Sequence, residues 1–113
     1  MVIEQSEILV IDRVSGFIQM KDDDAVKLFC LGKKEASALA ALLSSDERCC
    51  PKKKLKEAIW PDRQHVEDNQ VAAIISSLRK SLIKTKIKLE LKAITNYGYQ
   101  VIYSDNFVIE LVG

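Results

Sequence analysis

The sequence has little of what most catalytic and cofactor sites are built from. It contains one histidine, four glycines and three cysteines in 113 residues, and the glycines form no phosphate-binding loop. The single histidine, His65, has no serine, cysteine or carboxylate pair placed to act with it as nucleophile and base. We therefore expect neither an enzyme nor a small-molecule substrate, and no cofactor or metal.

The cysteines lack the spacing of a zinc site or a thioredoxin-like site. Cys30, Cys49 and Cys50 are odd in number, and no two of them are separated by two residues. Reduced thiols in a cytosolic protein are the natural interpretation. The alternative is an oxidant-sensing disulfide between Cys49 and Cys50, although successive strand residues point to opposite faces.

The sequence also has no segment typical of membrane spanning or export. No apolar run approaches the roughly 20 residues that cross a bilayer, and no basic stretch followed by an apolar one begins the chain. We therefore expect a cytoplasmic protein. Because 48% of the residues are hydrophobic, one domain over residues 1–113 can fill a core without disulfides or metals.

The net charge of +1 hides a separation of charge along the chain. Between Lys52 and Lys92, eleven Lys or Arg residues stand against five Asp or Glu residues, whereas the remainder has six against eleven. A basic segment of this kind is typical of a surface that binds a polyanion. A solvated lysine-rich face is the alternative interpretation.

Short apolar or alternating runs predict strands at both ends of the chain. Three strands are expected within residues 7–31, the last two separated by the turn residues Asp22–Asp24. A hairpin is expected over residues 89–103, where Asn96–Gly98 supplies residues that accept the positive φ of a tight turn. The apolar tail over residues 104–113 is either an extra strand or a linker.

Helical periodicity fills the middle of the chain. Helices are expected over residues 33–44, 52–60 and 67–82. Gly32 can cap the first of them, with Glu35 in the reciprocal position of a capping box. The predicted fold class is therefore α+β, with an N-terminal antiparallel sheet, three helices and a C-terminal hairpin.

The outward face of the third helix is unusual. Val71, Ile75 and Leu78 form an apolar side, whereas the opposite side carries small and polar residues instead of an ordinary Glu/Lys mixture. Small side chains allow close approach to a DNA groove, while amides, hydroxyls and cations bond to phosphates and base edges. A plain amphipathic core helix is the alternative.

The order of two helices, an angled long helix and a hairpin is that of a winged helix-turn-helix. Five motifs stand in sequence: Leu31–Glu35, Leu55, Trp60, Leu78–Leu82 and Gly98–Tyr99. This set resembles the C-terminal effector domain of OmpR/PhoB-type response regulators. Without a receiver domain, the chain is most similar to the N-terminal cytoplasmic domain of ToxR/CadC-type one-component regulators. It is then either free-standing or an excised part of a membrane-anchored bacterial regulator.

The resemblance implies sequence-specific DNA binding and transcription regulation. Residues 67–82 would enter the major groove, the hairpin would form the wing, and lysines would hold the phosphate backbone. Thr95 and Asn96 replace the Arg-Gly that is common at the wing. The charge pattern and the resemblance together give these DNA-contacting residues: Lys52, Lys53, Trp60, Asn69, Ala73, Ser76, Ser77, Arg79, Lys80, Lys84, Lys92, Thr95 and Asn96.

The resemblance also implies partners. Double-stranded DNA is the expected ligand, with two copies pairing on direct-repeat half-sites. The loop from Pro61 to Val66 matches a segment that touches RNA polymerase in some members. Because the predicted DNA-facing side of the long helix is small and weakly basic, a protein-interaction module without strong DNA binding remains the second hypothesis.

Overall fold

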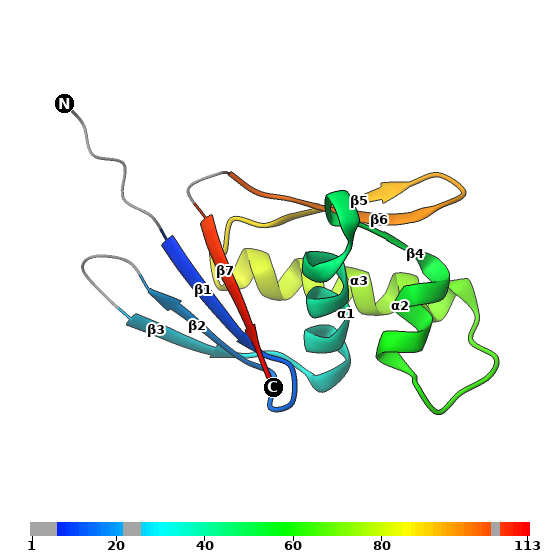
Figure 1. Cartoon of the computed structure of the whole chain (residues 1–113), viewed down its shortest axis with the longest axis horizontal. Coiled ribbons are helices and arrows are strands. Elements are labelled where there is room, and N and C mark those ends of the chain that lie inside the picture. The colour runs from blue at the N-terminus through cyan, green and yellow to red at the C-terminus, as the bar shows by residue number, and fades with distance from the viewer. Residues whose placement is uncertain (1–6, 22–25, 105–106) are drawn as a thin grey trace.

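The computed structural model describes residues 7–21, 26–104 and 107–113, so the turn predicted at Asp22–Asp24 lies outside the described residues. Strands lie at both ends of the chain, and the three α-helices come between them in sequence (Figure 1). The elements in order are β1 (Glu7–Asp12), β2 (Phe17–Lys21), β3 (Val26–Cys30), α1 (Lys33–Ser44), a short 3₁₀ helix (Asp46–Arg48), β4 (Cys49–Pro51), α2 (Lys52–Ile59), α3 (Asp68–Lys84), β5 (Glu90–Ile94), β6 (Gly98–Ile102) and β7 (Phe107–Val112).

The N-terminal sheet is completed by the other end of the chain. Its strand order is β3-β2-β1-β7, and the pairs β1/β2 and β2/β3 are antiparallel as predicted. The last strand, β7, runs parallel to β1 (Figure 1). The register of this pair sets Glu7 opposite Phe107. Of the two interpretations of the apolar tail, the extra strand is therefore the correct one.

The turn between β1 and β2 is held by one aspartate and one glycine. The Oδ1 atom of Asp12 accepts hydrogen bonds from the backbone N–H groups of Val14 and Ser15, at 2.9 and 3.2 Å. These bonds hold the pKa of the Asp12 carboxyl below its ordinary value. Gly16 has φ of 83°, and a Cβ atom there would lie 2.5 Å from the carbonyl oxygen of Leu31. Glycine is therefore required at this position.

The helices bury the apolar faces that their periodicity predicts. Leu39 of α1, Leu55 of α2 and Leu78 of α3 are all fully buried in one core. Helix α1 occupies the predicted residues, whereas α3 continues two residues beyond its predicted end. The inner face of the N-terminal sheet adds Leu9 and Ile18 to the same core, so the sheet and the helices share one hydrophobic interior.

Gly32 is the N-cap of α1, as the sequence predicts, and no side-chain bond completes a capping box there. Glu35 stands in the reciprocal position of such a box. Its two oxygens instead accept hydrogen bonds from the hydroxyl groups of Ser77 and Ser81, each at 3.0 Å. Glycine has no side chain with which to complete a box, so Glu35 is free to bond across to α3.

The hairpin β5–β6 pairs with β4 to form a second sheet in the order β4-β6-β5. Of the two turn residues expected to have positive φ, only Asn96 does, at 60°. Gly98 is required for another reason, because a Cβ atom there would overlap the backbone of Cys50 in β4. At the tip, the carbonyl oxygen of Tyr97 accepts a 3.0 Å bond from the N–H of Lys52. The first residue of α2 is thus joined to the hairpin turn.

Candidate nucleic-acid interface

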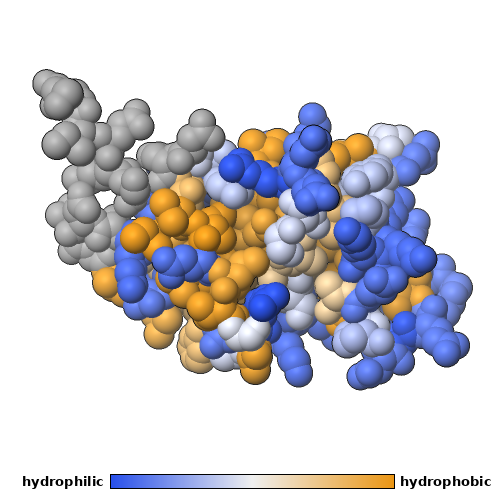
Figure 2. All heavy atoms as spheres, in the orientation of Figure 1, coloured by the Kyte–Doolittle hydropathy of each residue, from blue (hydrophilic) through white to orange (hydrophobic). Residues whose placement is uncertain are grey.

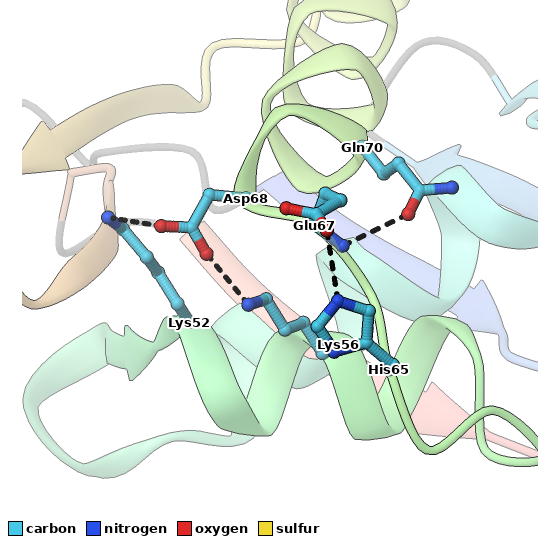
Figure 3. A network of polar contacts seen from close by, with 6 residues as sticks. All are labelled: Lys52, Lys56, His65, Glu67, Asp68 and Gln70. Carbon is cyan, nitrogen blue, oxygen red and sulfur yellow. Dashed lines mark hydrogen bonds and ion pairs between the residues drawn. The ribbon is translucent and has the colours of Figure 1, made fainter.

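The first turn of α3 is connected to α2 by two ion pairs that share one carboxylate. Lys52 and Lys56 lie one turn apart on α2, and their ammonium groups approach the two oxygens of Asp68 at 3.3 and 2.7 Å (Figure 3). Hydrogen bonds from Lys56 and Lys52 lower the pKa of the Asp68 carboxyl. These contacts connect the two helices on either side of the loop.

The residues just before α3 make a second set of local contacts. The N–H of Glu67 donates to the Oε1 atom of Gln70 at 3.0 Å, which satisfies a donor at the helix start. His65 Nε2 lies 2.9 Å from Glu67 Oε1, and the histidine side chain is 86% exposed (Figure 3). His65 is therefore a surface residue of the loop.

The two flanks of α3 contact the rest of the protein. On one flank, Ser77 and Ser81 donate to Glu35 of α1. On the other, Nε and Nη2 of Arg79 donate to the carbonyl oxygen of Leu91 in β5, at 3.2 and 2.9 Å. Ser77 and Arg79 were both predicted to contact DNA, and both are engaged within the domain.

The outward face of α3 lies between these flanks. At about 100° per residue, Asn69, Ala73, Ser76, Lys80 and Lys84 fall on the side opposite the buried residues, and all five are exposed. The predicted DNA-contacting residues on this helix are therefore brought onto one face, apart from Ser77 and Arg79.

The remaining predicted residues surround that helix at different degrees of exposure. Lys53 is exposed at the start of α2, next to the half-buried Lys52, and Trp60 is half-buried against the core at the end of α2. Its ring centroid is 5.7 Å from Nζ of Lys34, a distance suited to a cation–π contact. Lys92, Thr95 and Asn96 are exposed on the hairpin.

Three residues of this region were missed by the sequence reasoning. Lys56 and Asp68 form the ion-pair network, and Glu35 connects α1 to α3. The four-residue spacing of Lys52 and Lys56 does place them on one side of α2. Nothing local identifies their partner, because Asp68 reaches them only after the chain reverses through the loop.

The cysteines do not form a disulfide. Cys30, Cys49 and Cys50 are all free thiols, and Cys50 is fully buried while Cys49 is half-buried. Burial raises the pKa of the Cys50 thiol, which makes it a poor nucleophile. Within the described ranges, no three His, Cys, Asp or Glu residues gather as a metal site.

The geometry of a helix-turn-helix with a hairpin beside its second helix defines the winged-helix class of DNA-binding domains. Residues 27–101 match the family model described as "Transcriptional regulatory protein, C terminal". The chain belongs to this family, which comprises the OmpR/PhoB-type winged-helix domains of transcriptional regulators. Domains of this family regulate transcription and are not enzymes.

Individual proteins agree with that assignment. Transcriptional regulatory protein YxdJ of Bacillus subtilis (strain 168) is 31% identical over 71 residues, which cover 63% of this chain and 31% of YxdJ. The chain thus matches about a third of that relative. Among solved structures, the DNA-binding domain of response regulator AdeR, in complex with an intercistronic region, has a TM-score of 0.64 at 16% identity. That match covers 78% of this chain and 87% of AdeR's.

A second solved structure shares the fold. The DNA-binding domain of Escherichia coli CadC has a TM-score of 0.57 at 19% identity, and the match covers 89% of this chain and all of that one. At these identities the two structures establish the fold. Among the helices of the described residues, none combines the length and the apolar character needed to cross a membrane.

Proposed function

We propose that the domain binds double-stranded DNA by placing the outward face of α3 in the major groove. The observation that carries this proposal is the exposed row of Asn69, Ala73, Ser76, Lys80 and Lys84 on a helix fixed at both flanks. Small residues near the start of the helix permit close approach to base edges, and the lysines farther along can bond to phosphates. Membership of a family of transcriptional regulators supports the same ligand.

The elements beside α3 would hold the DNA backbone. Lys53 and Lys92 are exposed on α2 and the hairpin, and Lys52 can exchange Asp68 for a phosphate group. Trp60 contributes its indole N–H, while Thr95 and Asn96 lie at the wing tip near the minor groove. In this arrangement Ser77 and Arg79 orient the helix, because their hydrogen bonds connect it to α1 and β5.

Two protein contacts complete the proposal. Two copies would pair on direct-repeat half-sites. Pairing would raise the affinity for DNA above that of a single copy and would select for the spacing between the half-sites. The loop from Pro61 to Val66 would meet RNA polymerase, since its residues 61–65 are exposed while Val66 anchors it in the core. The expected location of such a regulator is the cytoplasm, either free or as one domain of an anchored protein.

The test is fluorescence anisotropy of a labelled random duplex of about 25 base pairs at about 50 and 200 mM salt. Binding at low salt that weakens at least roughly tenfold at the higher salt indicates several phosphate contacts. Lys80→Ala should weaken binding to all sequences without changing thermal unfolding. No binding of the duplex at either salt concentration would contradict the proposal.

A protein-interaction module is the second candidate, and the ion pairs of Figure 3 favour it. Lys52 and Lys56 already have a carboxylate partner, which lowers the positive charge available to phosphate. Such a module would show little affinity for any duplex even at about 50 mM salt. A pull-down from a cell extract would then be compared between the wild type and Lys80→Glu.

A further inference from the structure

The flank contacts of α3 decide which of its side chains can reach a base. Arg79 is the only arginine of the helix, and its guanidinium donates two hydrogen bonds to Leu91 of β5. Ser77 and Ser81 point the other way, to Glu35. The face left for DNA therefore lacks an arginine.

The absence of an available arginine matters because of how guanine is read. A guanine presents two acceptors, O6 and N7, in the major groove, and the commonest specific contact to it is a bidentate arginine or lysine. Lys80 lies eleven residues after Asn69, about 16 Å farther along the axis at 1.5 Å per residue. In helix-turn-helix docking the N-terminal residues of the helix meet the bases, so Lys80 and Lys84 are positioned for phosphates.

The side chains that remain near the start of α3 have a different chemistry. On the outward face, Asn69, Ala73 and Ser76 are all exposed. An asparagine amide pairs with N6 and N7 of adenine, and an alanine methyl packs against the C5-methyl group of thymine. A serine hydroxyl bonds to either kind of base pair and adds no preference.

We infer that α3 reads a short core of A·T pairs in the major groove, recognising adenine through Asn69 and a thymine methyl group through Ala73. This inference rests on the DNA docking proposed above and names the class of sequence that it selects. The ligand follows from the family and the docking, and the selectivity follows from Arg79 being held by β5 while amide and methyl groups face outward.

The experiment begins with selection from a duplex library containing about 20 randomised base pairs, a length that exceeds one helical turn of recognition. The most enriched duplex is then prepared in two altered forms. In the first, deoxyuridine replaces the core thymines, which removes only their methyl groups. In the second, inosine·cytosine pairs replace the core A·T pairs, which keeps an A·T-like minor groove and gives a G·C-like major groove.

The expected result is an A·T core in the enriched duplex. Loss of the thymine methyls should weaken binding about threefold to tenfold, and the inosine·cytosine form should lose at least about tenfold, since a bidentate contact discriminates by that order. Ala73→Ser should bind the thymine and deoxyuridine duplexes with similar affinity. Asn69→Ala should reduce the preference for adenine, while the matched control Ser37→Ala on α1 changes neither.

The opposing outcomes are distinct. A guanine-rich core, an absence of enrichment, or equal binding of all forms overturns the inference and leaves DNA binding standing. If the inosine·cytosine duplex binds as tightly as the A·T duplex, the selectivity comes from the minor groove and the inference is wrong. Failure of the random library to bind at low salt overturns both the docking and the base preference.

Discussion

The surface over α2 and α3 and the outer face of the N-terminal sheet are made of contrasting residues. Hydrophilic residues cover α2 and the loop that follows it, whereas hydrophobic residues gather over the sheet (Figure 2). The strand register places five exposed apolar residues on the outer side of that sheet, opposite the core. They are Phe17, Val26, Leu28, Val108 and Val112.

The contrast shows that the two surfaces should respond to salt in opposite ways. Charge interactions at α2 and α3 are screened as ionic strength rises. Apolar contacts of the sheet face are strengthened by salts such as sulfate, which are excluded from protein surfaces. A single change of salt can therefore separate the contribution of each surface to any binding that the domain shows.

The largest expected effect comes from reversing charge on the outward face of α3. Lys80→Glu combined with Lys84→Glu should weaken duplex binding roughly a hundredfold at low salt, because two phosphate contacts are lost and two repulsions are added. Anisotropy with the random duplex measures the change. Circular dichroism melting should show the same midpoint as the wild type, since both lysines are exposed.

A matched pair on the sheet provides the control for that charge reversal. Lys21→Glu combined with Lys27→Glu makes the same change of net charge on β2 and β3, where both lysines are exposed. Affinity should then fall no more than about twofold, because long-range charge effects are screened. Equal losses in both double variants would mean that net charge alone, and not the α3 face, governs binding.

The next effect concerns the contact between α1 and α3. Glu35→Ala should lower the free energy of unfolding by about 1–2 kcal/mol, since two partly buried hydroxyl groups lose their acceptor. Glu110→Ala, on the exposed side of β7, should change it by less than about 0.5 kcal/mol. Urea unfolding measures both, and similar values for the two variants would show that the α1–α3 bonds contribute little.

A smaller effect is expected from Asp68→Asn, which releases Lys52 and Lys56. Duplex affinity should rise about threefold at low salt and its salt dependence should steepen, because more lysines become available to phosphates. The control Asp62→Asn removes an exposed loop carboxylate outside the network and should have less effect. A loss of affinity in Asp68→Asn would show that the carboxylate positions the lysines for DNA.

The pH dependence of stability provides a further test of the Asp68 ion pairs. The pKa of Asp68 is lowered in the folded state, so its contribution to stability is present above the ordinary carboxyl pKa. It is lost as the pH falls through the lowered value. Asp68 therefore stays ionised near neutral pH, and the difference in stability between wild type and Asp68→Asn should be constant between about pH 6 and 8.

The smallest effect on stability is expected at the sheet face. Leu28 is 64% exposed, so Leu28→Ser should change the free energy of unfolding by less than about 0.5 kcal/mol. Binding of a hydrophobic dye should nevertheless fall, because the apolar patch becomes smaller. Leu28→Ile keeps the apolar patch and should keep the dye signal. Equal dye binding by both variants would mean that Leu28 is not part of the surface that binds the dye.

Much of the helical region could be predicted because its signals are local. Gly32, Pro51 and Pro61 mark helix boundaries, and the spacing of apolar residues from Val71 to Leu82 identifies the buried side of α3. The pattern predicts which residues of that helix face outward. It does not predict that Ser77 and Arg79, at the edges of that face, form hydrogen bonds with neighbouring elements.

The features that could not be predicted depend on residues distant in sequence. The strand β7 has a typical apolar pattern, but nothing in it specifies β1 as its partner or a parallel direction. The contacts of Glu35 with α3 and of Lys56 with Asp68 likewise join separate elements. Such pairings are selected by the packing of the whole domain, so a local pattern predicts the element but not its neighbour.

The parallel pairing of β1 with β7 has a consequence for how the domain folds. Every pair in that ladder, from Glu7 with Phe107 to Asp12 with Val112, joins residues one hundred positions apart. Such contacts must overcome a large loop-closure entropy, and they slow folding relative to the local contacts of helices. During synthesis the ladder cannot form until residues 107–112 have left the ribosome, whereas the helices, which precede them in the chain, can pack before that point.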